Sequence, residues 1–362
     1  MHSTSRCHSG IRALALFFFA APAWAQSTPA SLIAEGHYRR AEAIVRAELA
    51  KQPQDVTALV ELSIVLWSYG DLDKAEATAA KAVSIEDGSA AAHAQLVNIL
   101  GAELASKKAG AMEKMSLSHR FRKEAERTLQ LDPNNIYATE ALARYSWYAP
   151  MIAGGDKSKA MRIVDRVIQM DSTRGYTLKA ELDTTQDAGK ALADWKQAAA
   201  AKSDSYQAHV GLGKALLHAG GESWKSAEEE GRKALAVDSS REPAYVLLAT
   251  VYATTQQWQR LDAILREAHS AVPDDDGAEF AAAQIILDKS MQTEFSRAEA
   301  YFKNYLNTLA EGLEPNLAMA HWQLGLLLEK EGHRSTALHE VQTAASLDPS
   351  LDGAKHDAKR LQ

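Results

Sequence analysis

AMAHWQLGLLLEKEGHRSTALHEVQTAASLDP, residues Ala318–Pro349, contains the pattern from which the fold can be inferred. In its first part the apolar residues Trp322, Leu324 and Leu328 recur at helical spacing, which predicts a helix that buries one face. Gly332 interrupts this pattern and indicates a turn. The first part of the stretch therefore predicts one amphipathic helix that ends in a glycine turn.

A second helix is predicted over Ser335–Leu347. Ala337 and Ala344 lie seven residues apart on one stripe of this helix, where small side chains let two helices approach closely. Asp348 precedes Pro349, and the residue before a proline is disfavoured in the helical region, so the helix ends there. The product is a helical hairpin, and a lone hairpin cannot bury its apolar faces. It requires neighbours of the same kind.

Together these positions resemble the signature of the tetratricopeptide repeat family, whose period is about 34 residues: Leu324-Gly325, Gly332, Ala337, Ala344 and Asp348-Pro349. The resemblance recurs along the chain, and seven of the nine residues at the first small position are Ala: Ala41, Ala75, Phe121, Ala160, Ala191, Ala227, Leu261, Ala298 and Ala337. It implies an all-α fold, a right-handed α-α superhelical solenoid of about nine helical hairpins. We expect residues 26–362 to form this single solenoid, with residues 351–362 as a capping helix over its open end.

Three units depart from the regular repeat, near residues 90–133, 137–171 and 277–315. The first has a lengthened, basic second helix over Lys107–Arg127, which would meet an acidic partner or a membrane surface, or would be a solvated helix face. The second unit contains an inserted loop, Tyr148–Asp156, which resembles loops of some secreted bacterial repeat proteins. These units are the places where function could be added to a regular scaffold.

The first 25 residues have the features of a secretory signal peptide. Arg6 and Arg12 supply the positive leader, and the apolar core Ala13–Ala23 is too short to span a bilayer. Small residues favour cleavage after Ala25; a membrane anchor and an amphipathic first helix are the alternatives. The single cysteine, Cys7, would leave with this leader, which suits an oxidising compartment. We therefore expect an exported bacterial member of the family, periplasmic or secreted, without a stable membrane span after cleavage.

No motif for catalysis, cofactor or metal stands out. The net charge of −7 gives no basic footprint for nucleic acid. Gly211–Ala215 resembles a fragment of a phosphate-binding loop but lacks its spacer and its Ser or Thr, and a helix-packing role explains these glycines. The acidic run Asp274–Asp276 follows Pro273 and predicts a solvated loop. We expect no enzyme activity, no cofactor and no metal.

In tetratricopeptide stacks the first helix of each hairpin lines the concave wall. By that resemblance the wall here comprises Val60, Ile64, Trp67, Asn98, Tyr137, Glu140, Arg144, Trp147, Lys214, Trp322 and Leu326. The partner-binding candidates among and beside these residues are Trp67, Asn98, Arg144, Trp147, Tyr148 and Trp322. Arg144, Trp147 and Tyr148 form the preferred patch, because Arg and aromatic side chains dominate interface energetics. Packing between repeats is the alternative role for this patch.

The sequence thus predicts a non-catalytic protein–protein interaction scaffold, which docks a peptide or helix of an envelope or secreted protein in its concave groove. A small-ligand binder or enzyme that uses the loop at 148–156 is the alternative. Self-association through the terminal repeats is a third interpretation.

Overall fold

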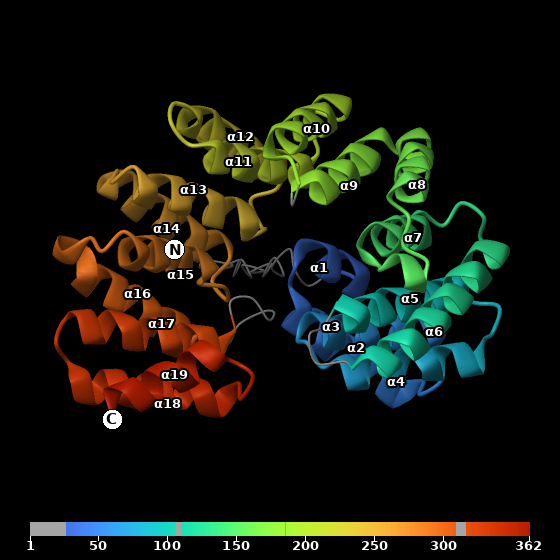
Figure 1. Ribbon diagram of the computed structural model, residues 1–362, viewed down its shortest axis with the longest axis horizontal. Coiled ribbons are helices and arrows are strands. Elements are labelled where there is room, and N and C mark those ends of the chain that lie inside the picture. The colour runs from blue at the N-terminus through green and yellow to red at the C-terminus, as the bar shows by residue number, and fades with distance from the viewer. Residues whose placement is uncertain (1–26, 106–109, 185, 309–315) are drawn as a thin grey trace, which may run out of the picture.

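The computed structural model describes residues 27–105, 110–184, 186–308 and 316–362 (Figure 1). This part of the chain folds into nineteen α-helices and two short 3-10 helices and contains no strand, so the all-α prediction is confirmed. The predicted signal peptide, the lysines at 107 and 108, and the end of the 277–315 unit lie outside the described residues.

The helices alternate between first and second members of antiparallel hairpins. The first helices are α1 (Pro29–Glu35), α3 (Val56–Ser68), α5 (Ala90–Ala105), α7 (Ile136–Tyr148), α9 (Ser172–Thr184), α11 (Tyr206–Ala219), α13 (Pro243–Thr254), α15 (Gly277–Asp288) and α17 (Leu317–Lys330). The second helices are α2 (Tyr38–Lys51), α4 (Leu72–Ile85), α6 (Ala111–Leu131), α8 (Lys157–Met170), α10 (Ala188–Ala201), α12 (Ser223–Val237), α14 (Trp258–Ala271), α16 (Phe295–Asn307) and α18 (Arg334–Leu347). The cap is α19 (Asp352–Leu361), and the 3-10 helices are η2 (Met151–Ala153) and η3 (Gln292–Glu294).

Helix ends follow local sequence signals. Asp55, Asn135 and Asn316 each precede a first helix, and each side chain accepts a hydrogen bond from a backbone N–H in the first turn. These caps satisfy donors that the helix itself cannot pair. Gly332 takes φ 85°, a left-handed value that glycine adopts without strain, and so allows the chain to turn from α17 into α18. The predicted boundaries of α18 and of the cap are correct to within one residue.

The first small position of each repeat, from Ala41 to Ala337, lies at the contact between the two helices of its hairpin. All nine residues at this position are 0–3% exposed, including the two large ones, Phe121 and Leu261. In the last hairpin, a Cβ added to Gly325 would lie 2.5 Å from Val341 Cγ2 and 3.1 Å from the Ala337 carbonyl oxygen. The two helices are therefore as close as their backbones allow, and Gly325 and Ala337 are the reason.

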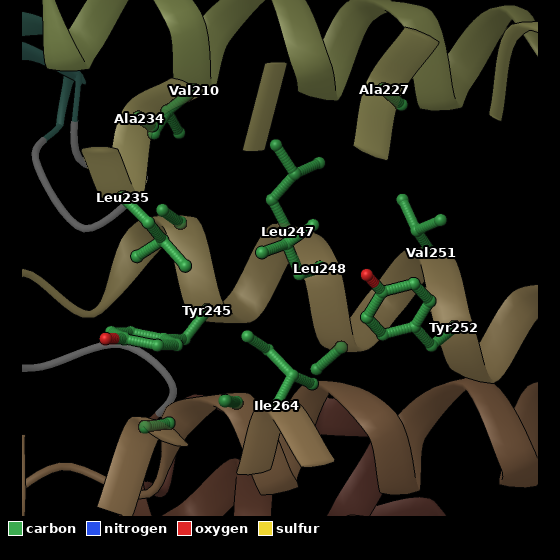
Figure 2. Close-up of a cluster of buried hydrophobic side chains, with 14 of the residues drawn as sticks. Val210, Ala227, Ala234, Leu235, Tyr245, Leu247, Leu248, Val251, Tyr252 and Ile264 are labelled. Atoms are coloured by element: carbon green, nitrogen blue, oxygen red, sulfur yellow. The ribbon is translucent and has the colours of Figure 1, made fainter. Parts of the chain in front are cut away.

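Apolar side chains from neighbouring hairpins interlock into continuous cores. The largest core joins α11 to α15, and Figure 2 shows Leu247, Leu248 and Val251 of α13 between Ala227 of α12 and Ile264 of α14. Because each hairpin packs one apolar face against the next hairpin, the buried side chains extend along the stack and do not form a single central core. This is the solenoid that the hairpin pattern predicts.

Most successive first helices contact one another, and the stack curls round until its beginning meets its middle (Figure 1). Arg40, at the start of α2, donates to Asp274 Oδ2 in the turn before α15, with Nη2 at 2.6 Å. His37, which is 4% exposed, hydrogen-bonds the backbone of Ser240. The prediction that Asp274–Asp276 form a solvated loop is correct only in part, because all three residues are partly exposed: Asp274 pairs with Arg40, and Asp276 accepts a hydrogen bond from Thr308.

The unit with the lengthened second helix, near residues 90–133, accommodates a large side chain at its first small position. Phe121 of α6 stacks on Tyr145 of α7 with ring centroids 4.8 Å apart, so a large aromatic fills the space that alanine fills elsewhere. Two basic residues of α6 are engaged with neighbouring repeats: Arg120 pairs with Glu76, and Arg127 pairs with Asp87 at 2.6 Å. Part of the basic character of α6 therefore holds repeats together.

Candidate functional site

The strongest candidate for a binding surface is a polar and aromatic network on the wall formed by α7 and α9. Tyr137, Glu140 and Arg144 are spaced along one face of α7, and Arg174 and Glu181 face them from α9. Arg174 donates to both carboxylate oxygens of Glu140, at 2.8 and 3.0 Å. Arg144 donates to Glu181 at 2.7 Å and lies 3.6 Å from Glu140. We call these five residues the α7–α9 network.

An aromatic ring extends the network to solvent. The guanidinium carbon of Arg174 lies 4.5 Å from the centroid of the Tyr137 ring, in cation–π geometry. Tyr137 is 55% exposed, whereas Glu140 is buried. Burial disfavours the charge of Arg174, but its hydrogen bonds to Glu140 and Tyr137 outweigh burial and raise its pKa above the ordinary value. Arg174 thus stays charged, and Tyr137 is the exposed aromatic beside it.

The predicted patch of Arg144, Trp147 and Tyr148 is divided by the structure. Arg144 remains at the surface within the network. Trp147 is 8% exposed and packs in the core between α7, α8 and α9, while Lys157 Nζ lies 5.0 Å from its ring centroid. Its ring is engaged in packing between repeats, the alternative role that the sequence left open. Tyr148 is 58% exposed at the end of α7.

The other candidates lie apart from this network along the stack. Trp67 is 37% exposed at the end of α3. Asn98 is partly buried and donates to Gln95 Oε1 at 3.4 Å. Trp322 packs against Gly353 of the cap, and its Nε1 donates to Asp357 at 3.0 Å. The cap helix therefore takes up the Trp322 ring, which sequence reasoning placed on the open wall.

The sequence analysis did not predict a histidine–glutamate hydrogen bond that joins the two helices in three of the hairpins. His93, His209 and His321 of the first helices each bring Nδ1 within 2.6 Å of a glutamate on the second helix: Glu124, Glu230 and Glu340. Each glutamate follows the small-residue position by three residues, and this spacing is the signal that could have revealed the pairs. These histidines are structural, and among the described residues no group of three or more His, Cys, Asp or Glu could hold a metal ion.

Two open clefts lie on the side of the second helices. One, of about 360 Å³, lies between α2, α3 and α4, and the other, of about 610 Å³, between α14, α15 and α16. Neither is lined by any residue of the 144–156 region. In that region the loop bonds to itself: Gly155 N donates to the Pro150 carbonyl, Asp156 N to the Ser146 carbonyl, and the Tyr145 hydroxyl to Ala153. Its polar groups do not converge on a ligand-sized space.

The acidic turn before α15 is electrostatically unusual. Burial and the neighbouring Asp275 raise the pKa of Glu242 well above 4.5. Burial, with repulsion from Asp274 and Asp276, raises the pKa of Asp275 to about 6 although the Gly277 N–H opposes this shift. Burial lowers the pKa of the facing His37 below 6.5. Three groups with perturbed pKa values therefore lie at or beside the contact between the start of α2 and the turn before α15.

Comparison with known proteins fits this architecture. The model of the tetratricopeptide repeat family matches residues 31–92 and 181–242. These two matched segments, about a third of the chain, are tetratricopeptide repeats, and stacked helical hairpins continue through the rest of the described residues. No curated protein matches the chain.

Solved structures similar to this chain include the following three. Yeast Tom70 is 14% identical with a TM-score of 0.50, over 92% of this chain and 86% of Tom70. The repeat protein TTC0263 from Thermus thermophilus is 17% identical with a TM-score of 0.46, over 52% of this chain and 95% of its own. A chain of the Cut9–Hcn1 hetero-tetramer of the APC/C is 15% identical with a TM-score of 0.45, over 89% of this chain and 58% of the matched chain. At 14% identity the likeness to Tom70 concerns the fold alone.

Of the helices that the structure describes, none combines the length and the apolar character needed to cross a bilayer.

Proposed function

We propose that this protein is a non-catalytic scaffold of the bacterial periplasm, which captures an extended peptide or a helix of an envelope or secreted protein in its concave groove. The tetratricopeptide repeat fold supports a role in protein–protein interaction. The observation that carries the finer proposal is the α7–α9 network, which offers an exposed tyrosine and two fixed arginines on one stretch of wall.

The network is suited to binding because it is organised before a partner arrives. Arg174 and Arg144 are each held by two contacts, so little side-chain entropy remains to be lost on binding. Tyr137 adds a large amphipathic surface next to them, and Tyr and Arg are the residue types that most often dominate interface energies. A partner that carries a carboxylate and an apolar side chain would be matched by this arrangement.

The experiment is site-specific photocrosslinking in a bacterial cell. A photoreactive phenylalanine at Tyr137 should crosslink to one defined protein, whereas the same residue at Gln197, which is exposed on the second helix α10, should not. The double substitution Tyr137→Ala with Arg144→Ala should remove partner binding by the purified protein and leave its helical circular dichroism unchanged. Equal crosslinking at both positions, or binding that survives the double substitution, would refute the proposed surface.

The proposed location rests on the leader and is tested separately. Exported protein should be recovered from the periplasmic fraction with Gln26 as its first residue, because Ala25 ends the small-residue site. Recovery from the cytoplasm with an intact leader would contradict the location without touching the binding surface. Sedimentation velocity over a range of concentrations tests self-association, which would give a mass that rises with concentration.

A further inference from the structure

The turn between α7 and α8 exposes two adjacent apolar side chains. Met151 is 88% exposed and Ile152 is 94% exposed, the two highest values among the large hydrophobic residues of the described chain. Single exposed apolar residues are ordinary, but two consecutive ones at the tip of an inserted turn form a protruding apolar knob. With Tyr148, which is 58% exposed just before the turn, they form what we call the apolar tip.

Glycine geometry and backbone hydrogen bonds define the conformation of the apolar tip. Gly154 takes φ 93°, and a Cβ added to Gly155 would lie 1.8 Å from the Ala149 carbonyl oxygen, so only glycine permits this closure. Gly155 N donates to the Pro150 carbonyl at 3.0 Å, and Asp156 N donates to the Ser146 carbonyl at 2.8 Å. The backbone thus turns its polar groups inward while Met151 and Ile152 point outward. Their exposure results from a defined local structure.

Basic residues surround the apolar tip. Lys157 and Lys159 are exposed in the first turn of α8, where the helix dipole disfavours cations. The Arg122 guanidinium of α6 lies next to Gly154, 3.9 Å from the position of an added Cβ. Residues 110–170 contain ten Lys and Arg against seven Asp and Glu, whereas the whole chain has a net charge of −7. The cations here oppose helix stability and the apolar side chains oppose solubility, which indicates that another function keeps them together.

We propose that this turn docks on an anionic lipid surface, with Met151 and Ile152 inserted at the acyl boundary and Lys157 and Lys159 on the headgroup phosphates. To bury a protruding apolar knob, a protein partner would need a complementary apolar pocket. A bilayer interface can bury the same side chains without a preformed pocket. Apolar side chains that enter the interface, surrounded by Lys and Arg, are the combination that binds peripheral proteins to anionic membranes. The docked protein would keep the α7–α9 network free for a partner, because its residues lie along the wall and not at the turn.

The test places a fluorescent reporter on the turn itself. In a Cys7→Ser background, Ile152→Cys carries an environment-sensitive dye, and Ala263→Cys on the exposed side of α14 is the matched control. The dye at position 152 should shift to shorter wavelength on vesicles of phosphatidylglycerol and phosphatidylcholine, and should not shift on phosphatidylcholine alone. Because the signal arises at the labelled residue, the leader cannot produce it, and the control position should stay unchanged on both vesicles.

The cations are tested by a second pair of variants. Lys157→Gln with Lys159→Gln should weaken binding to the anionic vesicles by roughly 25-fold, since each cation near such a surface contributes about fivefold. Lys196→Gln with Lys225→Gln, which removes the same charge from exposed positions of α10 and α12, should change binding by less than about twofold. No shift at position 152, an equal shift at position 263, or equal losses in the two double variants would each overturn the proposal. Crosslinking from Tyr137 is independent of these results, so the two proposals can fail separately.

Discussion

Replacement of Ala337 by leucine tests the geometry on which the whole stack depends. Ala337 is 0% exposed and lies against Gly325, where an added Cβ would already contact the Ala337 carbonyl at 3.1 Å and Val341 at 2.5 Å. A leucine side chain must push α17 and α18 apart or leave its preferred rotamer. Overpacking of this kind costs about 1–3 kcal/mol.

The cost should appear locally because each unit of a solenoid contacts only its neighbours. Hydrogen exchange read by mass spectrometry resolves this. A loss of about 1–3 kcal/mol corresponds to about 5- to 150-fold faster exchange, expected in peptides from α17, α18 and α19. Peptides from α3 and α4, at the other end of the stack, should exchange at the rate of the unchanged protein.

The matched control is Ala80→Leu on α4, which adds the same side chain at an exposed position of a second helix. It should change exchange by less than about twofold, since surface substitutions usually stay within about 0.5 kcal/mol. Unchanged exchange in α17–α19 of the Ala337→Leu protein would refute the close-contact reasoning. Faster exchange in both variants would show that leucine itself, and not its position, is the cause.

Three further predictions concern charged and hydrogen-bonded groups. His209→Ala leaves the buried Glu230 carboxylate without its imidazole partner and should lower the free energy of unfolding, measured by urea denaturation, by about 1–3 kcal/mol. An unchanged free energy of unfolding would show that this hydrogen bond does not stabilise the fold. Burial raises the pKa of Glu242, so its neutral form stabilises the fold at acid pH and this stability is lost as pH rises above 4.5. Glu242→Gln should therefore raise the urea midpoint at neutral pH but leave it unchanged at acid pH, and an equal shift at both would contradict the assignment. Arg40→Ala removes the ion pair to Asp274, which is about one-third exposed on each side, and should cost less than about 1 kcal/mol yet increase the radius of gyration seen by X-ray scattering; an unchanged radius would show that the curl closes without it.

The candidate site shows where reasoning from the sequence reaches its limit. Tyr137, Glu140 and Arg144 were placed on the wall from the repeat register, and the structure joins them to Arg174 and Glu181 of the next hairpin. Register fixes the face on which a residue lies, because every unit repeats the same geometry. It does not determine which side chain of the neighbouring hairpin that residue contacts, because this depends on how far one hairpin is rotated relative to the next.

Trp147 and Trp322 show the same limit for burial. Both occupy first helices at wall positions, yet Trp147 packs among three helices and Trp322 is taken up by the cap. An aromatic ring is large enough to reach either the groove or the neighbouring hairpin. Which of these it contacts is decided by the free volume that the neighbours leave, and no single repeat contains that information.

The hairpin, its glycine turn, its small-residue contact and the cap could all be predicted from the amino-acid order, because these features depend on residues at most one repeat apart. The meeting of Arg40 with Asp274, 234 positions further on, emerged from the folded stack alone. Small rotations between successive hairpins accumulate along the stack, and their sum sets which distant surfaces meet. The spacing of residues within one repeat does not determine this accumulated rotation.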